Sequence, residues 1–189
     1  MTTITPSPAR KPHSLTRGFT LVELMIGAGL SSFILAGVLS SFLFIGRSGA
    51  NVQNYNDMES QARKALESFA EDTRQASGIV WNSAVSVGLT VNGATVTYAY
   101  DSAAKTFSRT AASTTRTLVS GITSFNFSAY NISGTALSLA SAADLTAANG
   151  TTKQLQISLE AARTSTTVVA ATNTVLSARF IMRNKKVTA

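Results

Sequence analysis

One uninterrupted apolar stretch constrains this chain more than any other feature. Residues 19–46 are apolar or small, with a single ionisable side chain, Glu23. As a helix that rises about 1.5 Å per residue, the stretch is roughly 40 Å long, which exceeds the hydrocarbon thickness of about 30 Å in a bilayer. The stretch therefore predicts one membrane-spanning helix near the N-terminus.

The carboxylate of Glu23 is the unusual group in that span. A charged side chain at the centre of a membrane helix costs about 2.5–3.5 kcal/mol on insertion scales. Glu23 lies near one end, so its cost is lower, but a carboxylate in this position still needs a partner. A proton relay would require a second carboxylate, and residues 19–46 contain none.

The first eighteen residues differ in composition from the rest of the chain. They hold all three prolines and the cations Arg10, Lys11 and Arg17, and they lack the apolar core of a secretory signal peptide. The positive-inside rule keeps this leader in the cytoplasm and places the C-terminal part outside. Of the 16 basic residues in the chain, 13 follow the leader and face 9 acidic residues, and this small excess is scattered. The charge therefore gives little support to a nucleic-acid partner.

The string GFTLVEL at residues 18–24 follows the basic leader and opens the apolar run. In this combination it resembles the N-terminal motif of the type IV pilin superfamily. The resemblance implies that a prepilin peptidase cuts between Gly18 and Phe19 and methylates the new amine of Phe19. It also implies that Glu23 pairs with the N-terminal ammonium of a neighbouring subunit, so that residues 19–46 serve as inner-membrane anchor and then as filament core. The alternative for this stretch is a plain signal anchor with a chance glutamate.

The apolar run contains three glycines for which two roles stay open. Gly27, Gly29 and Gly37 each cost about 1 kcal/mol relative to alanine in a helix. They could allow the helix to melt during assembly, or they could allow close packing against another helix.

Residues 47–78 keep a helical period after the chain turns polar. Apolar and small side chains follow steps of three and four at Tyr55, Met58, Ala62, Ala65, Leu66, Phe69, Thr73 and Ala76. With no proline and no turn cluster in between, we expect one helix that begins in the membrane and ends near Gly78, whose second half packs on a sheet. A coiled-coil partner is the rival for this amphipathic half.

Residues 79–189 change to the period of two that is typical of strands. The clearest signal is a hairpin around Asn92-Gly93, a pair that suits a two-residue turn. Further strands are expected near 105–110, 114–119, 122–130, 154–160 and 175–182, and residues 133–152 are expected to be a loop with at most one short helical turn. Strands that follow a helix without helical crossovers predict an antiparallel sheet. The expected fold class is thus α+β, a pilin-like long helix packed on one antiparallel sheet.

The residues offer little to catalysis or to a cofactor. There is no cysteine, and the only histidine, His13, lies in the leader. The acidic residues after the helix, Asp101, Asp144 and Glu160, are far apart in sequence and are interpreted as surface groups. We therefore expect no enzyme, no metal site and no cofactor; an anchored hydrolase is the alternative from that class.

Two further groups of residues, one aromatic and one cationic, could have either a structural or a binding role. Trp81, Tyr98 and Tyr100 fall on alternating positions and are interpreted as core rather than as a binding platform. The cations near the C-terminus are interpreted as a solvated tail rather than a nucleic-acid contact; they are Arg179, Arg183, Lys185 and Lys186.

Weaker patterns favour a subtype within the superfamily. The segments 61–66, 72–76, 124–130, 155–159 and 182–184 resemble the W-type minor pilins and the J-type pseudopilins of type II secretion. The resemblance implies a non-enzymatic subunit that primes or caps a type IV pilus or a pseudopilus, with prepilin peptidase and other pilin subunits as partners. A major pilin and a DNA-uptake pilin are the alternatives.

Overall fold

The structure is a computed structural model that describes residues 18–165 and 168–187. Contacts divide the chain into two compact units, Met1–Ile45 and Gly46–Ala189. Helix α1, Leu21–Gln75, runs through both units and confirms the single long helix expected from residues 19–78. The predicted leader lies outside the described residues, apart from Gly18.

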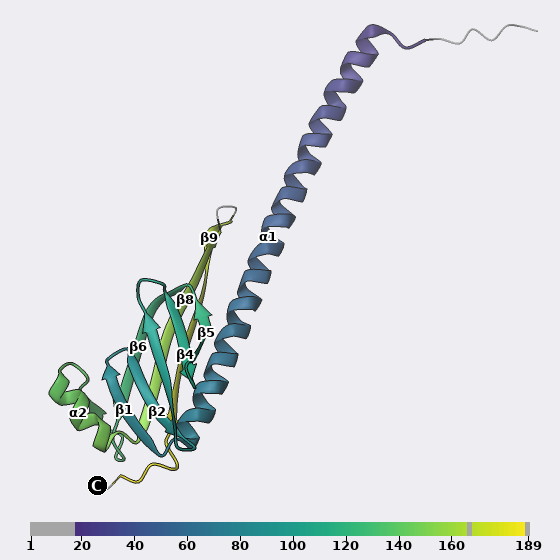
Figure 1. The fold of residues 1–189 in the computed structure, drawn as a ribbon. Helices are drawn as coiled ribbons and strands as arrows, with labels where there is room; N and C mark the ends of the chain where they lie inside the picture. The colour runs from purple at the N-terminus through teal and green to yellow at the C-terminus, as the bar shows by residue number, and fades with distance from the viewer. Residues whose placement is uncertain (1–17, 166–167, 188–189) are drawn as a thin grey trace, which may run out of the picture. The chain divides into compact units, whose positions relative to one another are not determined.

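The strands form two antiparallel sheets in the second unit (Figure 1). The five-stranded sheet has the order of the sequence: β1 (Gly78–Ser83), β2 (Ser86–Val91), β3 (Ala94–Asp101), β4 (Thr106–Ala111) and β5 (Thr114–Ser120). The four-stranded sheet has the order β7 (Ala136–Leu137), β6 (Ile122–Tyr130), β8 (Gln154–Ser165) and β9 (Val168–Ile181). The α+β class with antiparallel pairing is confirmed.

The expectation of one sheet was wrong, and Gly121 gives the reason. Ser120 still pairs with Thr106 in the first sheet, whereas Ile122 pairs with Ala161 in the second. Gly121, between them, takes a φ of 76°, a left-handed conformation that favours glycine. One residue therefore turns the chain from one sheet to the other.

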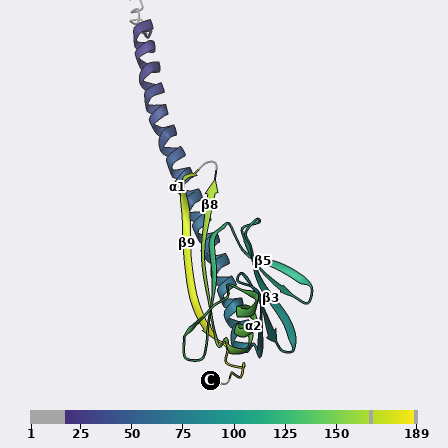
Figure 2. The same ribbon diagram turned by 90° about the vertical axis from the view of Figure 1, so that its left-hand side faces the viewer.

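Both sheets pack on the C-terminal half of α1, and Figure 2 shows them on either side of it. Phe69 of α1 has ring centroids 5.0 Å from Tyr98 in the first sheet and 5.8 Å from Phe127 and Phe180 in the second. The apolar face of the helix is buried at most of the positions that its period predicts, which are Met58, Ala62, Ala65, Phe69 and Thr73. Tyr55, the first position of that predicted face, is exposed instead. A second sheet thus gives this face a partner on each side.

The predicted hairpin around Asn92-Gly93 is confirmed. Val91 pairs with Ala94, and the two turn residues have φ values of 51° and 80°. Val87 and Leu89, with Val96 and Tyr98 on the partner strand, point into the core. Trp81 and Tyr98 are buried, and Tyr100 is half-buried and stacks on Phe125 at the margin of the core, so these aromatic side chains belong to the core as interpreted.

Gly78 does not end the helix, which stops at Gln75. It opens β1 instead, opposite Thr90. A Cβ on Gly78 would lie 3.1 Å from the Thr90 hydroxyl oxygen, closer than almost all real contacts. The glycine is thus explained by close approach of two strands.

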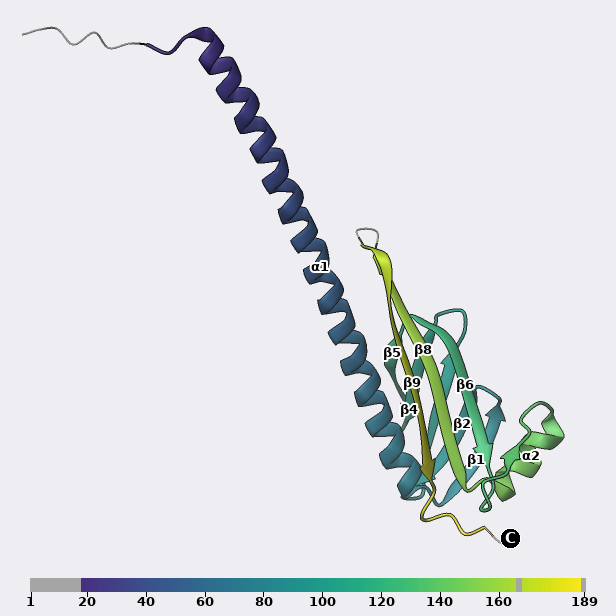
Figure 3. The same cartoon turned by 180° about the vertical axis from the view of Figure 1, so that it is seen from behind.

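The segment 133–152 is more ordered than expected, because it holds β7 and a ten-residue helix, α2, Ala142–Thr151. The Ser141 hydroxyl accepts a hydrogen bond from the Asp144 amide, and the Asp144 carboxylate accepts one from the Ser141 amide. This reciprocal cap starts the helix. Ala148 of α2 is buried, and Figure 3 shows α2 beside β1. The segment is rich in Ala, Ser, Thr and Gly, and this composition made the capping pair Ser141 and Asp144 hard to recognise in the sequence.

The C-terminal segment after β9 was expected to be a solvated tail, but in the structure it is hydrogen-bonded to the end of α2. The Lys185 ammonium is buried and donates to three backbone carbonyl oxygens, of Asn149 at 2.6 Å, Thr152 at 2.9 Å and Gly150 at 3.2 Å. Burial, followed by the like charge of Lys153, lowers the pKa of Lys185. The last turn of α2 has no basic residue of its own, so Lys185 caps it.

Replacing Lys185 by Met is expected to destabilise the second unit by about 2–3 kcal/mol, because three carbonyls lose a charged donor. Trp81 is the only tryptophan in the chain, and its indole nitrogen donates to the Thr152 hydroxyl beside this site. Urea unfolding of the full chain in detergent, followed by tryptophan fluorescence, measures the change. Lys186→Met, at an exposed neighbour, is the matched control and should shift stability by less than about 0.5 kcal/mol. Equal effects of the two substitutions would contradict the cap.

A buried polar group joins α1 to the five-stranded sheet. The Tyr98 hydroxyl donates to the Asp72 carboxylate at 2.6 Å, and Arg109 Nε approaches the same oxygen at 2.8 Å. Burial and the hydrogen bond to Asp72 raise the pKa of Tyr98. The helix, β3 and β4 are thereby held in one register.

Tyr98→Phe is expected to cost about 1–2 kcal/mol at neutral pH, because it removes the hydrogen bonds of the Tyr98 hydroxyl with Asp72 and with Arg109 but leaves the pair of Asp72 with Arg109 in place. In the unfolded chain Tyr98 ionises near pH 10, whereas the folded chain keeps it neutral at higher pH. The unfolded state therefore binds fewer protons above pH 10, and this residue makes the wild-type stability fall with pH. The gap between wild type and variant should shrink by about 1.4 kcal/mol per pH unit above pH 10. A gap that is constant with pH would contradict the buried phenol.

Candidate processing and assembly site

The bond between Gly18 and Phe19 lies just ahead of the long helix. Residues 18–20 are non-helical and exposed, and α1 begins at Leu21. The Phe19 side chain is 87 % exposed, and a Cβ placed on Gly18 would meet no atom within 4 Å. The backbone here is exposed, and no described residue lies close enough to require a glycine at position 18.

Thr20 and Glu23 form a reciprocal cap on the first turn of α1. The Glu23 carboxylate accepts hydrogen bonds from the Thr20 amide and the Thr20 hydroxyl, both at 2.9 Å. The Glu23 amide donates to the Thr20 hydroxyl oxygen at 3.2 Å. The pattern Thr-x-x-Glu before an apolar run is the known sequence sign of a capping box. Thr20 and Glu23 have this spacing in the sequence, so the cap is a local feature that the sequence alone indicates.

The cap places the Glu23 carboxylate beside the start of the helix, where the partial positive charge of the amides stabilises an anion. Among the residues that the structure describes, Thr20 is the only hydrogen-bond partner recorded for this carboxylate. Chemically, a cation that forms at Phe19 would arise within one turn of the carboxylate. The site therefore combines an exposed Gly18–Phe19 bond with a nearby anion.

The residues that follow form a helix surface that no other described part of the chain covers. Every residue from 18 to 50 is exposed. The large side chains include Phe33 at 81 %, Phe44 at 74 % and Phe42 at 68 % exposure. By length and composition, α1 can cross a membrane, and no other helix among the described residues passes that test. A continuous apolar surface of this size requires lipid or protein around it.

The helix satisfies its own polar groups in this region. The hydroxyls of Ser32 and Ser41 donate to the carbonyls of Ala28 and Gly37, one turn earlier. Cβ atoms on Gly27, Gly29 or Gly37 would meet no atom within 4 Å. Any packing role for these glycines therefore requires a neighbouring molecule.

The four C-terminal cations do not form one patch. Lys185 is buried against α2, as described above. The Arg179 guanidinium lies 3.5 Å from the centroid of the Tyr130 ring and donates to Gln156. Only Arg183 and Lys186 remain as exposed side chains without a recorded contact within the described residues.

The remaining acidic residues lie apart. Asp101 accepts from the amides of Ala103 and Ala104 in its own turn, Asp144 caps α2, and Glu160 lies in β8. Within residues 18–165 and 168–187, no group of three His, Cys, Asp or Glu side chains is placed to hold a metal ion. Among the described residues, the exposed Gly18–Phe19 bond and the Glu23 carboxylate of the apolar helix are therefore the best candidates for a functional site.

Comparison with known proteins adds no relative. No family model matches the chain, and no curated protein matches it in sequence.

Proposed function

We propose that this chain is a subunit of the type IV pilin superfamily, stored in the inner membrane and assembled into a fibre. One observation carries the proposal: an exposed Gly18–Phe19 bond stands directly before a helix whose first turn holds Glu23 and whose next residues are apolar and uncovered. Each part has a use in such a subunit, as cleavage site, docking charge and membrane anchor.

In this proposal prepilin peptidase cuts after Gly18 and methylates the amine of Phe19. The leader stays in the cytoplasm, and the second unit lies outside the inner membrane, as the basic leader favours. The fold class agrees with a pilin-like arrangement, because one long helix packs its second half on antiparallel sheets.

Assembly would be selected by charge. Before extraction, the Glu23 carboxylate is satisfied by Thr20. In the fibre, the ammonium of Phe19 from a neighbouring subunit would pair with it. An ion pair in a low dielectric is favourable only with good geometry, and an unpaired charge there is expensive. Subunits in the wrong register would therefore be rejected.

We assign the chain to the minor pilins or pseudopilins, of the W type or J type, rather than to the major pilins. The support is the set of sequence segments in the second unit that resemble these subtypes. A minor subunit primes or caps the fibre through contacts with a few neighbours, so it is present in small amounts.

The test is the presence of the chain in sheared, purified fibres of the native host, measured with an antibody against the second unit. We expect the mature chain in the fibres at a small fraction of the main subunit, and its absence from fibres when prepilin peptidase is deleted. Abundance equal to the main subunit would indicate a major pilin. Absence from both pili and pseudopili in the wild type would contradict the proposal.

A further inference from the structure

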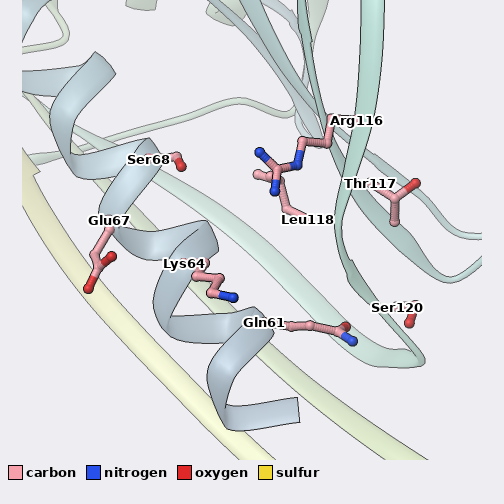
Figure 4. Close-up of a pocket in the computed structure, with 8 residues that line it drawn as sticks. All are labelled: Gln61, Lys64, Glu67, Ser68, Arg116, Thr117, Leu118 and Ser120. Atoms are coloured by element: carbon pink, nitrogen blue, oxygen red, sulfur yellow. The ribbon is translucent and has the colours of Figure 1, made fainter. Parts of the chain in front are cut away.

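A polar groove lies between α1 and the edge strand β5, entirely within the second unit. Its volume is about 550 Å³. The lining comes from one face of the helix and from the last strand of the five-stranded sheet: Gln61, Lys64, Glu67, Ser68, Arg116, Thr117, Leu118 and Ser120. Figure 4 shows the side chains of Gln61 and Lys64 reaching from the helix toward β5, the Arg116 guanidinium reaching toward the helix, and Glu67 pointing away.

The two cations in this groove make no direct ion pair within the described residues. Lys64 and Arg116 are exposed, and no hydrogen bond or ion pair is recorded for either within the described residues. Arg116 also stands directly opposite Arg109 in the register of β4 and β5. Arg109 has Asp72 as its ion-pair partner, whereas Arg116 makes no ion pair within the described residues, although Glu71 lies on the helix face nearby. An anion in the groove would relieve this repulsion.

The other wall of the groove is a free strand edge. Strand β5 is the last strand of its sheet, and it pairs only with β4 among the described residues. Its register shifts at Leu118, which lies half-buried in the groove. An edge strand presents amide and carbonyl groups that can bond to an added strand.

We propose that this groove receives an extended segment of another protein, which pairs with β5 and places a carboxylate between Lys64 and Arg116. No segment within residues 18–165 and 168–187 of the chain itself meets this requirement. Of its acidic residues only two lie on strands: Asp101 binds its own turn, and Glu160 lies in β8, which has a strand on each side. The occupant is therefore a different subunit rather than a second copy.

Nucleic acid fits the groove less well. Two cations neutralise few phosphates, and the helix face beside them carries Glu67 and Glu71. The phosphates of a nucleic acid would be repelled by Glu67 and Glu71, whereas a single carboxylate placed between Lys64 and Arg116 would be repelled less.

The test is binding of synthetic peptides to the full chain in detergent, measured by fluorescence anisotropy. The probe is an eight-residue peptide of alternating Thr and Val with one central Glu. Matched peptides carry Gln or Lys in its place, and another carries Pro beside the Glu to interrupt strand pairing. We expect the Glu peptide to bind, the Lys and Pro peptides to bind at least about tenfold more weakly, and the amides of β5 to exchange hydrogen more slowly in the complex.

Two charge-reversal variants complete the test. Arg116→Glu should weaken the Glu peptide at least about tenfold and strengthen the Lys peptide, whereas Lys186→Glu, at an exposed site outside the groove, should change neither by more than about twofold. Unchanged Trp81 fluorescence shows that the variants remain folded. Equal binding of the Glu and Lys peptides, undiminished binding of the Pro peptide, or no binding would overturn the proposal. So would preferential binding of a single-stranded oligonucleotide. None of these results bears on the processing of Gly18, so this proposal and the proposed function fail separately.

Discussion

Glu23→Ala chains are expected to insert into the inner membrane at wild-type levels and to be at least about tenfold depleted from fibres. The substitution removes a costly carboxylate from a membrane helix, so insertion is not impaired. It leaves the Phe19 ammonium of the neighbouring subunit without a partner in a low dielectric, and an unpaired buried charge costs about 3–5 kcal/mol. Membrane fractionation and immunoblots of sheared fibres measure both quantities.

Glu23→Gln separates the cap that the structure shows for this side chain from the charge pairing that we propose for it. Glutamine serves in a capping box as well as glutamate does, so the bonds to Thr20 can persist. Glutamine carries no charge, so the ion pair is lost. We expect Glu23→Gln to be as defective as Glu23→Ala. Thr20→Ala provides the converse control, because it removes a cap worth about 1 kcal/mol and keeps the carboxylate. Normal incorporation of Glu23→Gln would contradict the charge pairing.

Gly18→Val is expected to leave the chain at its precursor size, with cleavage slowed roughly a hundredfold. A branched side chain next to the scissile bond displaces the carbonyl from the catalytic groups of the peptidase. The chain's own fold is not affected, because a Cβ at this position would meet nothing. Immunoblots of membranes from cells with active peptidase measure the ratio of precursor to mature chain.

Gly49→Val is the matched control for that substitution. Gly49 is exposed, and a Cβ there would likewise meet no atom within 4 Å. It lies in α1, far along the chain from the cleavage site, so processing should be normal. Full processing of Gly18→Val, or an equal defect in Gly49→Val, would contradict the assignment of the cleavage site.

Local patterns allowed much of the fold to be predicted. The helix from residue 21 to residue 75 has a composition that suits a membrane and then a period of three and four, and both are properties of contiguous residues. The turn at Asn92-Gly93 needs two residues with positive φ, and asparagine and glycine are the residues that adopt this conformation most easily, so the pair predicts the turn directly. The strands near residues 122–130 and 154–160 alternate clearly, and the structure confirms them.

What could not be predicted depends on contacts between distant residues. A lysine in a basic C-terminal segment looks solvated, and only the fold brings Lys185 to the carbonyls that end α2. The group formed by Asp72, Tyr98 and Arg109 likewise joins three elements that no local pattern connects. The division into two sheets depends on the strand with which the chain pairs after Gly121, and this pairing also joins residues that are distant in sequence.

The candidate site at residues 18–23 could be predicted from local sequence, whereas the groove beside β5 could not. Gly18, Phe19 and Glu23 were proposed from a short string whose resemblance to a superfamily is specific. Their geometry, with the Thr20 cap on Glu23, rests on neighbours three residues apart and could have been predicted from Thr-x-x-Glu. The groove beside β5 could not, because its cations come from segments more than fifty residues apart in sequence.

The central claim is that the chain is a processed pilin-like subunit, and the mass of its mature N-terminus tests that claim most directly. The chain would be purified from membranes of cells with active prepilin peptidase, and its intact mass and N-terminal peptide would be measured. The account predicts that Phe19 is the first residue and that its amine carries one methyl group. An N-terminus upstream of Gly18 in those cells would contradict it.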